Sequence, residues 1–318
     1  MLAAPDLHGR QYAEAHSDAV DAWFREVFTE ALGTGPGLAL VAVGGYGRRE
    51  LAPRSDVDVI LIHDDLEDYA DAAEALWYPV WDRGLKMGYA VVNLEQAELL
   101  AREELHWATA FLSARLIAGE EHLLVGLQEA TDRVWADPEH DLLDQLADSV
   151  HQRHGRFGDV AFQIEPNLKE GRGGLRDLHS MLWAGRVTTD EPGFSVGPQL
   201  TADADRLLEA RVALHRIASG TGDVLTLDIQ DDVAAALGDA SADELMVRLA
   251  TAARRIAWYS DEAWYRWEKR VGRIGPATAM NVPIPTDFGL VDGYLELADV
   301  DVAGDPLMPL RLAVSSAR

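Results

Sequence analysis

Two aspartates that stand two positions apart have the types and spacing of a metal site. Asp56 and Asp58 flank Val57 ahead of the apolar run Val59–Ile62, a pattern typical of a buried strand. Residues two apart on a strand share a face and lie roughly 7 Å apart, so the two carboxylates raise each other's pKa unless a cation lies between them. A hard ion such as Mg2+, with Mn2+ as an alternative, is held by one or two carboxylates and substrate phosphates. We therefore expect Asp56 and Asp58 to bind metal and to be catalytic.

A glycine-rich turn and a cation precede this pair. The apolar run Leu38–Val43 breaks at Gly44-Gly45-Tyr46-Gly47, and Arg48 follows directly. Glycine lets the backbone adopt positive φ and approach a ligand closely, so that successive N–H groups can surround an anion. The guanidinium of arginine is a planar cation suited to phosphate. The residues expected to hold the phosphates of a nucleotide are Gly44, Gly45, Arg48 and Ser55.

The arrangement differs from two other glycine-rich nucleotide sites. No Gly-Lys-Ser/Thr follows the glycines, which excludes a Walker P-loop. The next segment contains Pro53 and leads to a strand, whereas a Rossmann turn leads to a helix. Gly-Gly, ten intervening residues and Asp-x-Asp on an apolar strand is the pattern of polymerase-β-like nucleotidyltransferases. There the glycine turn holds a triphosphate, and the carboxylates hold metal that aligns it for in-line attack.

A second segment, residues 157–176, combines glycines with positive charge. Its periodicity is not helical, and it lies in a chain whose formal net charge is −26. One interpretation is a loop that folds back over the nucleotide and helps to neutralise the triphosphate. The alternative is a structural connection with solvated charges. The cations in and just before the segment are Arg153, Arg156, Lys169, Arg172 and Arg176.

Both segments resemble one family. Residues 41–58 are similar to the active-site segment of the PII uridylyltransferase/uridylyl-removing enzymes, and the similarity continues at Arg153-His154, Glu165–Glu170 and Gly173–Leu178. The resemblance implies a metal-dependent transfer of UMP or AMP from UTP or ATP onto a tyrosine of the PII nitrogen-regulatory protein. It implies metal ligation by Asp56 and Asp58. It also implies that three cations of the second segment close over the nucleotide: Lys169, Arg172 and Arg176.

The chain departs from this family in two respects. No third carboxylate appears in the expected third strand, and Asp82 and Glu104 are weak substitutes. Family members often have Arg-Thr where this chain has Val92-Asn93. The usual HD phosphohydrolase motifs and ACT domains are also missing, so we expect the N-terminal nucleotidyltransferase part or a short relative.

Two other functions stay open at this point. One is a nucleotidyltransferase with a different acceptor, such as glutamine synthetase or a small molecule. The other is a non-catalytic nucleotide-binding or interaction module, because the third carboxylate is missing. The choice between UTP and ATP also stays open, since no motif describes the base pocket.

Composition and charge restrict the class of protein. The 318 residues are enough for two domains, and a net charge of −26 does not suit binding to bulk nucleic acid. There is no cysteine and no apolar run of transmembrane length, so we expect a cytoplasmic protein without membrane contact. We predict an α+β fold: a polymerase-β-like domain over residues 1–135, then a mainly helical domain over residues 136–318 with the second signature and a short C-terminal extension.

Periodicity predicts where the elements lie. Helices are expected over Tyr12–Leu32 and Asp65–Asp82, a third strand over Lys86–Leu94, and mostly helices from there to His154. Further helices are expected over Ala202–Ser219 and Ala242–Arg270, and a short strand or hairpin over Gly289–Leu297. The histidines at 63, 106, 122 and 140 are expected to be ordinary surface or capped residues, and a metal site at His151 and His154 is disfavoured.

Overall fold

The computed structural model describes residues 6–65, 69–82, 86–188, 192–218, 220, 222–274, 288–291 and 294–297. Residues 1–264 form one compact unit and residues 265–318 a second. In the second unit, β5 (Phe288–Val291) pairs antiparallel with β6 (Tyr294–Leu297), the second of the two forms predicted there, a short strand or a hairpin. The site discussed below lies wholly in the first unit.

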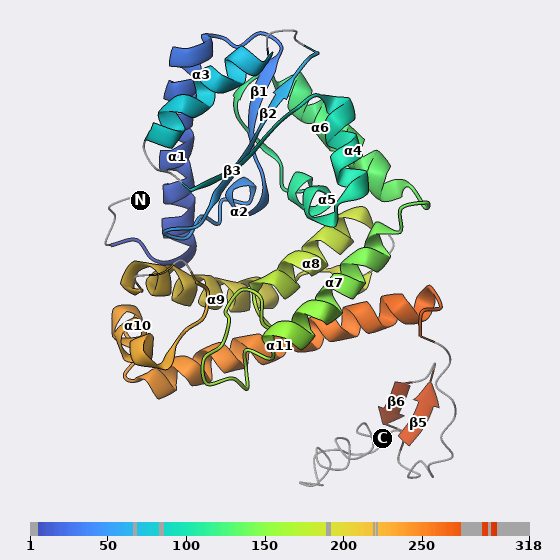
Figure 1. The fold of residues 1–318 in the computed structure, drawn as a ribbon. Helices are drawn as coiled ribbons and strands as arrows, with labels where there is room; N and C mark the ends of the chain where they lie inside the picture. The colour runs from blue at the N-terminus through green and yellow to red at the C-terminus, as the bar shows by residue number, and fades with distance from the viewer. Residues whose placement is uncertain are drawn as a thin grey trace. The chain divides into compact units, whose positions relative to one another are not determined.

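A four-stranded mixed sheet is the scaffold of the first unit (Figure 1). Its strands are β1 (Leu38–Ala42), β2 (Val57–His63), β3 (Met87–Val92) and β4 (Arg115–Gly119), in the order β3-β2-β1-β4. β1 runs antiparallel to both β2 and β4, whereas β2 and β3 are parallel. The strands β1 and β2 are almost wholly buried, which explains why both appear as continuous apolar runs.

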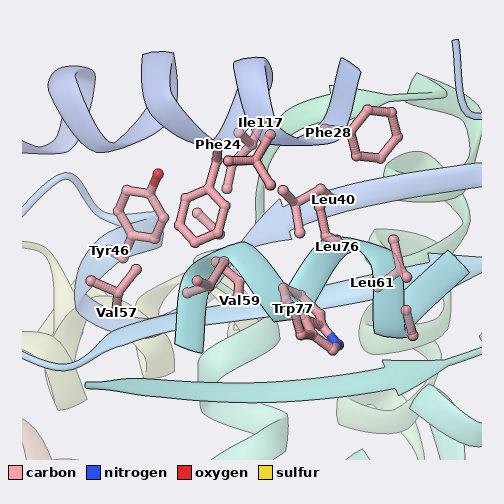
Figure 2. Close-up of a cluster of buried hydrophobic side chains, with 14 of the residues drawn as sticks. Phe24, Phe28, Leu40, Tyr46, Val57, Val59, Leu61, Leu76, Trp77 and Ile117 are labelled. Atoms are coloured by element: carbon pink, nitrogen blue, oxygen red, sulfur yellow. The ribbon is translucent and has the colours of Figure 1, made fainter. Parts of the chain in front are cut away.

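Helices cover both faces of this sheet (Figure 1). On one face lie α1 (Gly9–Leu32) and α3 (Tyr69–Asp82), whose apolar sides pack on the strands around Phe24, Tyr46 and Trp77 (Figure 2). On the other face lie α4 (Leu94–Glu103), α5 (Leu105–Phe111) and α6 (Glu121–Ala136). Two covered faces make the sheet a rigid base for any residue at its ends.

The rest of the first unit is helical. α7 (Leu142–Phe157), α8 (Leu175–Val187) and α9 (Pro198–Ile217) are followed by α10 (Gln230–Leu237) and by α11 (Ala242–Arg270). Short 3-10 turns span Pro192–Phe194 and Leu227–Ile229. The long α9 packs against α1, and α7 and α8 pack against each other. No helix among the described residues is both long and apolar enough to cross a bilayer.

The small mixed sheet and the many helices confirm the predicted α+β class. The third strand and the main helices lie where the periodicity placed them, while α1 begins three residues earlier, at Gly9. The boundary predicted after residue 135 stays a prediction. One expectation was wrong: His63 is 3% exposed and stacks on Tyr69 with ring centroids 4.2 Å apart, because it is the last residue of the buried strand β2.

Candidate active site

The glycine turn forms a single helical turn, α2 (Gly44–Gly47), between β1 and the loop to β2. Gly44 has φ +58°, a conformation that side chains other than glycine rarely adopt. A Cβ built on Gly44 would lie 3.4 Å from Oδ2 of Asp58, and one built on Gly47 would lie 2.0 Å from the carbonyl oxygen of Ser113. Gly44 is therefore required by its positive φ, and Gly47 by the close approach of the Ser113 carbonyl.

The two aspartates have unequal surroundings at the start of β2. Burial raises the pKa of Asp58, and the neighbouring Asp56 raises it further. Asp56 has a side chain that is 48% exposed, and its Oδ1 lies 2.8 Å from Nζ of Lys86. The charge of Asp56 is thus balanced by a lysine, whereas among the described residues no lysine, arginine or histidine nitrogen lies within 4 Å of the Asp58 carboxylate.

Both predicted segments line one cavity of about 760 Å³. Eight lysine and arginine side chains line it, against five carboxylates, although the whole chain has a net charge of −26. The cavity is thus a local cationic site in an acidic protein, and it suits an anionic ligand. The charged lining residues are Arg48, Arg54, Lys86, Arg153, Arg156, Lys169, Arg176, Arg211, Glu50, Asp56, Asp58, Glu170 and Asp223.

The second segment reaches the cavity with two of its three predicted cations. Lys169 and Arg176 line it, and both lie near Glu170, at 3.7 Å and 3.3 Å. Burial lowers the pKa of Lys169, and the adjacent Arg176 and Arg211 lower it further. Arg172, in contrast, is not a lining residue, because its guanidinium binds Asp159 and Asp261. The structure therefore brings together Lys169 and Arg176, but not Arg172.

Arg48 is held in place by a buried network with two partners that the sequence did not indicate. Its Nε donates to Oε2 of Glu50 at 2.9 Å, and its Nη2 lies 3.4 Å from Nδ1 of His179. Burial lowers the pKa of His179 to about 4, so this ring is neutral at neutral pH. Burial alone would raise the pKa of Glu50, but His179 and Arg48 hold it well below its usual range. Within the described residues Nη1 of Arg48 is buried without a hydrogen-bond partner.

Ser55 is held by a second network from α9 and the segment that follows it. Nη2 of Arg211 donates to Oγ of Ser55 at 3.2 Å, and Nε of Arg211 donates to Asp223 at 2.6 Å. His215 lies 2.8 Å from the same carboxylate. Burial would raise the pKa of Asp223, but His215 and Arg211 hold it well below its usual range. Nothing in the sequence indicated Arg211, His215 or Asp223, because they lie over 150 residues from Ser55 in the chain.

The candidate metal site has only two carboxylates. Among the described residues no group of three or more His, Cys, Asp or Glu side chains is arranged to hold a metal ion. Neither Asp82 nor Glu104 lines the cavity, and Glu104 pairs with His106. His154 binds Asp177, so it is not placed as a metal ligand. Asp56 and Asp58 fit Mg2+ only if the phosphates of a substrate complete the coordination.

Comparison with known proteins relates this site to one family. A family model described as GlnD PII-uridylyltransferase matches residues 141–201. Over its full length the chain is 36% identical to a bifunctional uridylyltransferase/uridylyl-removing enzyme of Streptomyces coelicolor, and it covers 40% of that protein. Proteins of the same name from Mycobacterium tuberculosis and Thiobacillus denitrificans are 33% and 34% identical over 88% and 92% of the chain, which covers 36% of each.

The fold and the site define an α+β protein with a cationic cavity beside a carboxylate pair. The resemblance seen in the sequence is confirmed: over most of its length, this chain is related to the PII uridylyltransferase/uridylyl-removing enzymes. The chain spans less than half the length of these relatives.

Proposed function

We propose that the chain transfers a nucleotidyl group from a nucleoside triphosphate onto a tyrosine of the PII protein, with Mg2+ as cofactor. One observation carries the proposal: a single cavity holds the glycine turn, the Asp56–Asp58 pair and the cations Lys169 and Arg176. The names of the relatives support uridylyl transfer, so UTP is proposed as the donor rather than ATP.

In this proposal each group of residues contacts a different part of the nucleotide. Gly44 and Gly45 approach the triphosphate with their backbone, and the guanidinium of Arg48, which lines the same cavity, binds one of its oxygens. Lys169 and Arg176 stabilise the β- and γ-phosphates. Asp56 and Asp58 would hold Mg2+, which supplies charge neutralisation and alignment when it is bound.

The transfer is an in-line displacement at the α-phosphorus. The tyrosine oxygen forms a bond to the α-phosphorus, and the bond between the α-phosphorus and the oxygen that bridges to the β-phosphate breaks. Pyrophosphate leaves with the bonding electron pair, and the nearby cations stabilise its charge. The phenol proton passes to a carboxylate of the Asp56–Asp58 pair.

Mass spectrometry of PII after incubation with the protein, Mg2+ and either UTP or ATP tests this function. We expect PII to gain the mass of one UMP per modified tyrosine with UTP, and little or no product with ATP. Asp56→Asn and Asp58→Asn variants serve as matched controls and should give no product. Unmodified PII in all reactions would contradict the proposal.

A non-catalytic nucleotide-binding module is the second candidate. The donor set favours it, since among the described residues no third carboxylate or histidine joins Asp56 and Asp58 to hold a metal ion. Such a module would bind UTP equally well with and without Mg2+ and would leave PII unmodified. Calorimetric titration with UTP in both conditions separates the two candidates.

A further inference from the structure

One edge of the sheet is open next to the candidate active site. β3 is a terminal strand, and among the described residues it pairs only with β2, in parallel. The N–H of Val57 donates to the carbonyl of Lys86. In a parallel ladder every second residue directs its N–H and C=O groups toward the same neighbouring strand, so Gly88 and Ala90 also direct theirs toward β2. The residues between them must direct their N–H and C=O groups away from the sheet.

These outward-facing residues are Met87, Tyr89 and Val91. Within the described part of the chain, no hydrogen bond from outside the sheet reaches their backbone groups. All three side chains are at least partly exposed. An unpaired row of this kind is a template for a further strand.

The carboxylate of Asp58 lies between the glycine turn and this open edge. Asp58 is directly opposite Gly88 in the register of β2 and β3. A Cβ built on Gly88 would lie 2.5 Å from Oδ1 of Asp58, whereas Oδ2 is the oxygen nearest to Gly44. One oxygen thus lies over the edge strand, and the other faces the turn where we place the nucleotide. Because Gly88 has no side chain, a group that crosses the edge strand meets the carboxylate directly.

Exposed aromatic residues lie on the opposite face of the same edge. Tyr89 is 48% exposed and Trp81, on α3, is 47% exposed, with ring centroids 5.8 Å apart. Trp77 lies beneath Tyr89 at 5.4 Å and is buried in the core shown in Figure 2. Exposed tyrosine and tryptophan are enriched in protein interfaces, so this face suits a polypeptide.

We propose that the acceptor protein adds an extended segment to the open edge of β3 and places its tyrosine over Gly88, beside Asp58. This inference rests on the proposed function. Strand addition gives affinity through main-chain hydrogen bonds, and side chains on an added strand alternate between faces. The acceptor tyrosine therefore faces Asp58, and its two neighbours in the segment face Tyr89 and Trp81.

A proline at an outward-facing position tests the inference. It removes one external N–H and obstructs an added strand, but it leaves the ladder to β2 intact. Tyr89→Pro and Tyr89→Ala both lose the ring, so the comparison isolates the backbone. We expect a KM for purified PII about tenfold higher in Tyr89→Pro than in Tyr89→Ala, with equal UTP affinity.

The possible outcomes separate this inference from the function on which it rests. Equal KM values in the two folded variants would overturn the inference and leave the proposed function standing. A wild-type protein that does not modify PII would overturn both. If Tyr89→Pro does not fold, amide hydrogen exchange of the wild-type protein decides. Saturating PII with a non-hydrolysable UTP analogue should then slow exchange over residues 87–91 but not in the opposite edge strand β4. Unchanged exchange over residues 87–91 in the complex would overturn the inference.

Discussion

Asp58 and Asp56 are neighbours in the sequence but differ in their electrostatic environment. Asp58 is half-buried with a raised pKa, whereas Asp56 is exposed and paired with Lys86. The sequence predicted that the two carboxylates share a face. It gave no sign of the lysine, since the pairing depends on the register of β3 against β2.

Replacing Asp58 by Asn should abolish transfer and raise the melting temperature at neutral pH. The ordinary pKa of the carboxyl is 3.8, and the folded state raises it. The native state therefore binds a proton more readily than the unfolded chain. Its free energy of unfolding falls as pH rises from the ordinary pKa of the carboxyl through the raised pKa of the folded state. Asparagine has no charge to bury, so the variant does not lose this stability. Its melting temperature should exceed that of the wild type only slightly in acid, and the difference should grow toward neutral pH. A variant that melts well below wild type at neutral pH would instead show that Asp58 is structural.

Lys169→Ala and Arg176→Ala should each weaken UTP binding. A charge-assisted contact to phosphate contributes about 1.5–3 kcal/mol, or about ten- to a hundredfold in affinity. The loss should be smaller for UMP, which has no β- or γ-phosphate. Arg172→Ala is the matched control, because this arginine of the same segment binds Asp159 and Asp261 outside the cavity. Calorimetric titration with UTP and UMP provides the measurement. A ratio of UTP affinity to UMP affinity that is the same in the variants as in the wild type would contradict the assignment of Lys169 and Arg176 to the β- and γ-phosphates.

The elements that could be predicted are those whose pattern is local. β1, the glycine turn and β2 are consecutive, and their apolar runs and glycines indicate them directly. The second segment was identified by its charge, but charge does not indicate which way a side chain points, and Arg172 points away from the cavity. The contributions of α8 and α9, including His179 and Arg211, depend on tertiary packing and could not be found from the sequence.

Gly88→Ala tests how strictly β3 positions the carboxylate. The new methyl group would lie 2.5 Å from Oδ1 of Asp58, so the carboxylate must shift. A displacement of this size at a reacting group can lower the rate about a hundredfold, while UTP binding without metal should stay within about twofold. Gly155→Ala is the control: no atom lies within 4 Å of the added Cβ, and the helix α7 should gain about 0.5–1 kcal/mol. Steady-state rates and melting curves of both variants provide the test. A wild-type rate in Gly88→Ala would show that catalysis does not depend on the exact position of the Asp58 carboxylate.

At the scale of the whole molecule, the charge distribution is strongly uneven. The chain is acidic overall, yet the cavity has a surplus of cations from segments more than a hundred residues apart. Composition predicted the global charge and therefore the need for a local positive site. It could not locate that site fully, because Arg211 reaches the cavity only when the helix α9 packs beside the sheet.

The position of Asp58 between the glycine turn and the edge of β3 also has a kinetic consequence. Its Oδ1 lies beside the edge strand and its Oδ2 beside the glycine turn, so under the proposed function nucleotide and acceptor can be bound at the same time without displacing each other. Direct transfer in a ternary complex then needs no covalent nucleotidyl-enzyme. Double-reciprocal plots of initial rate against UTP concentration, at several fixed PII concentrations, should intersect. Parallel lines would mean that the first product leaves before the acceptor enters.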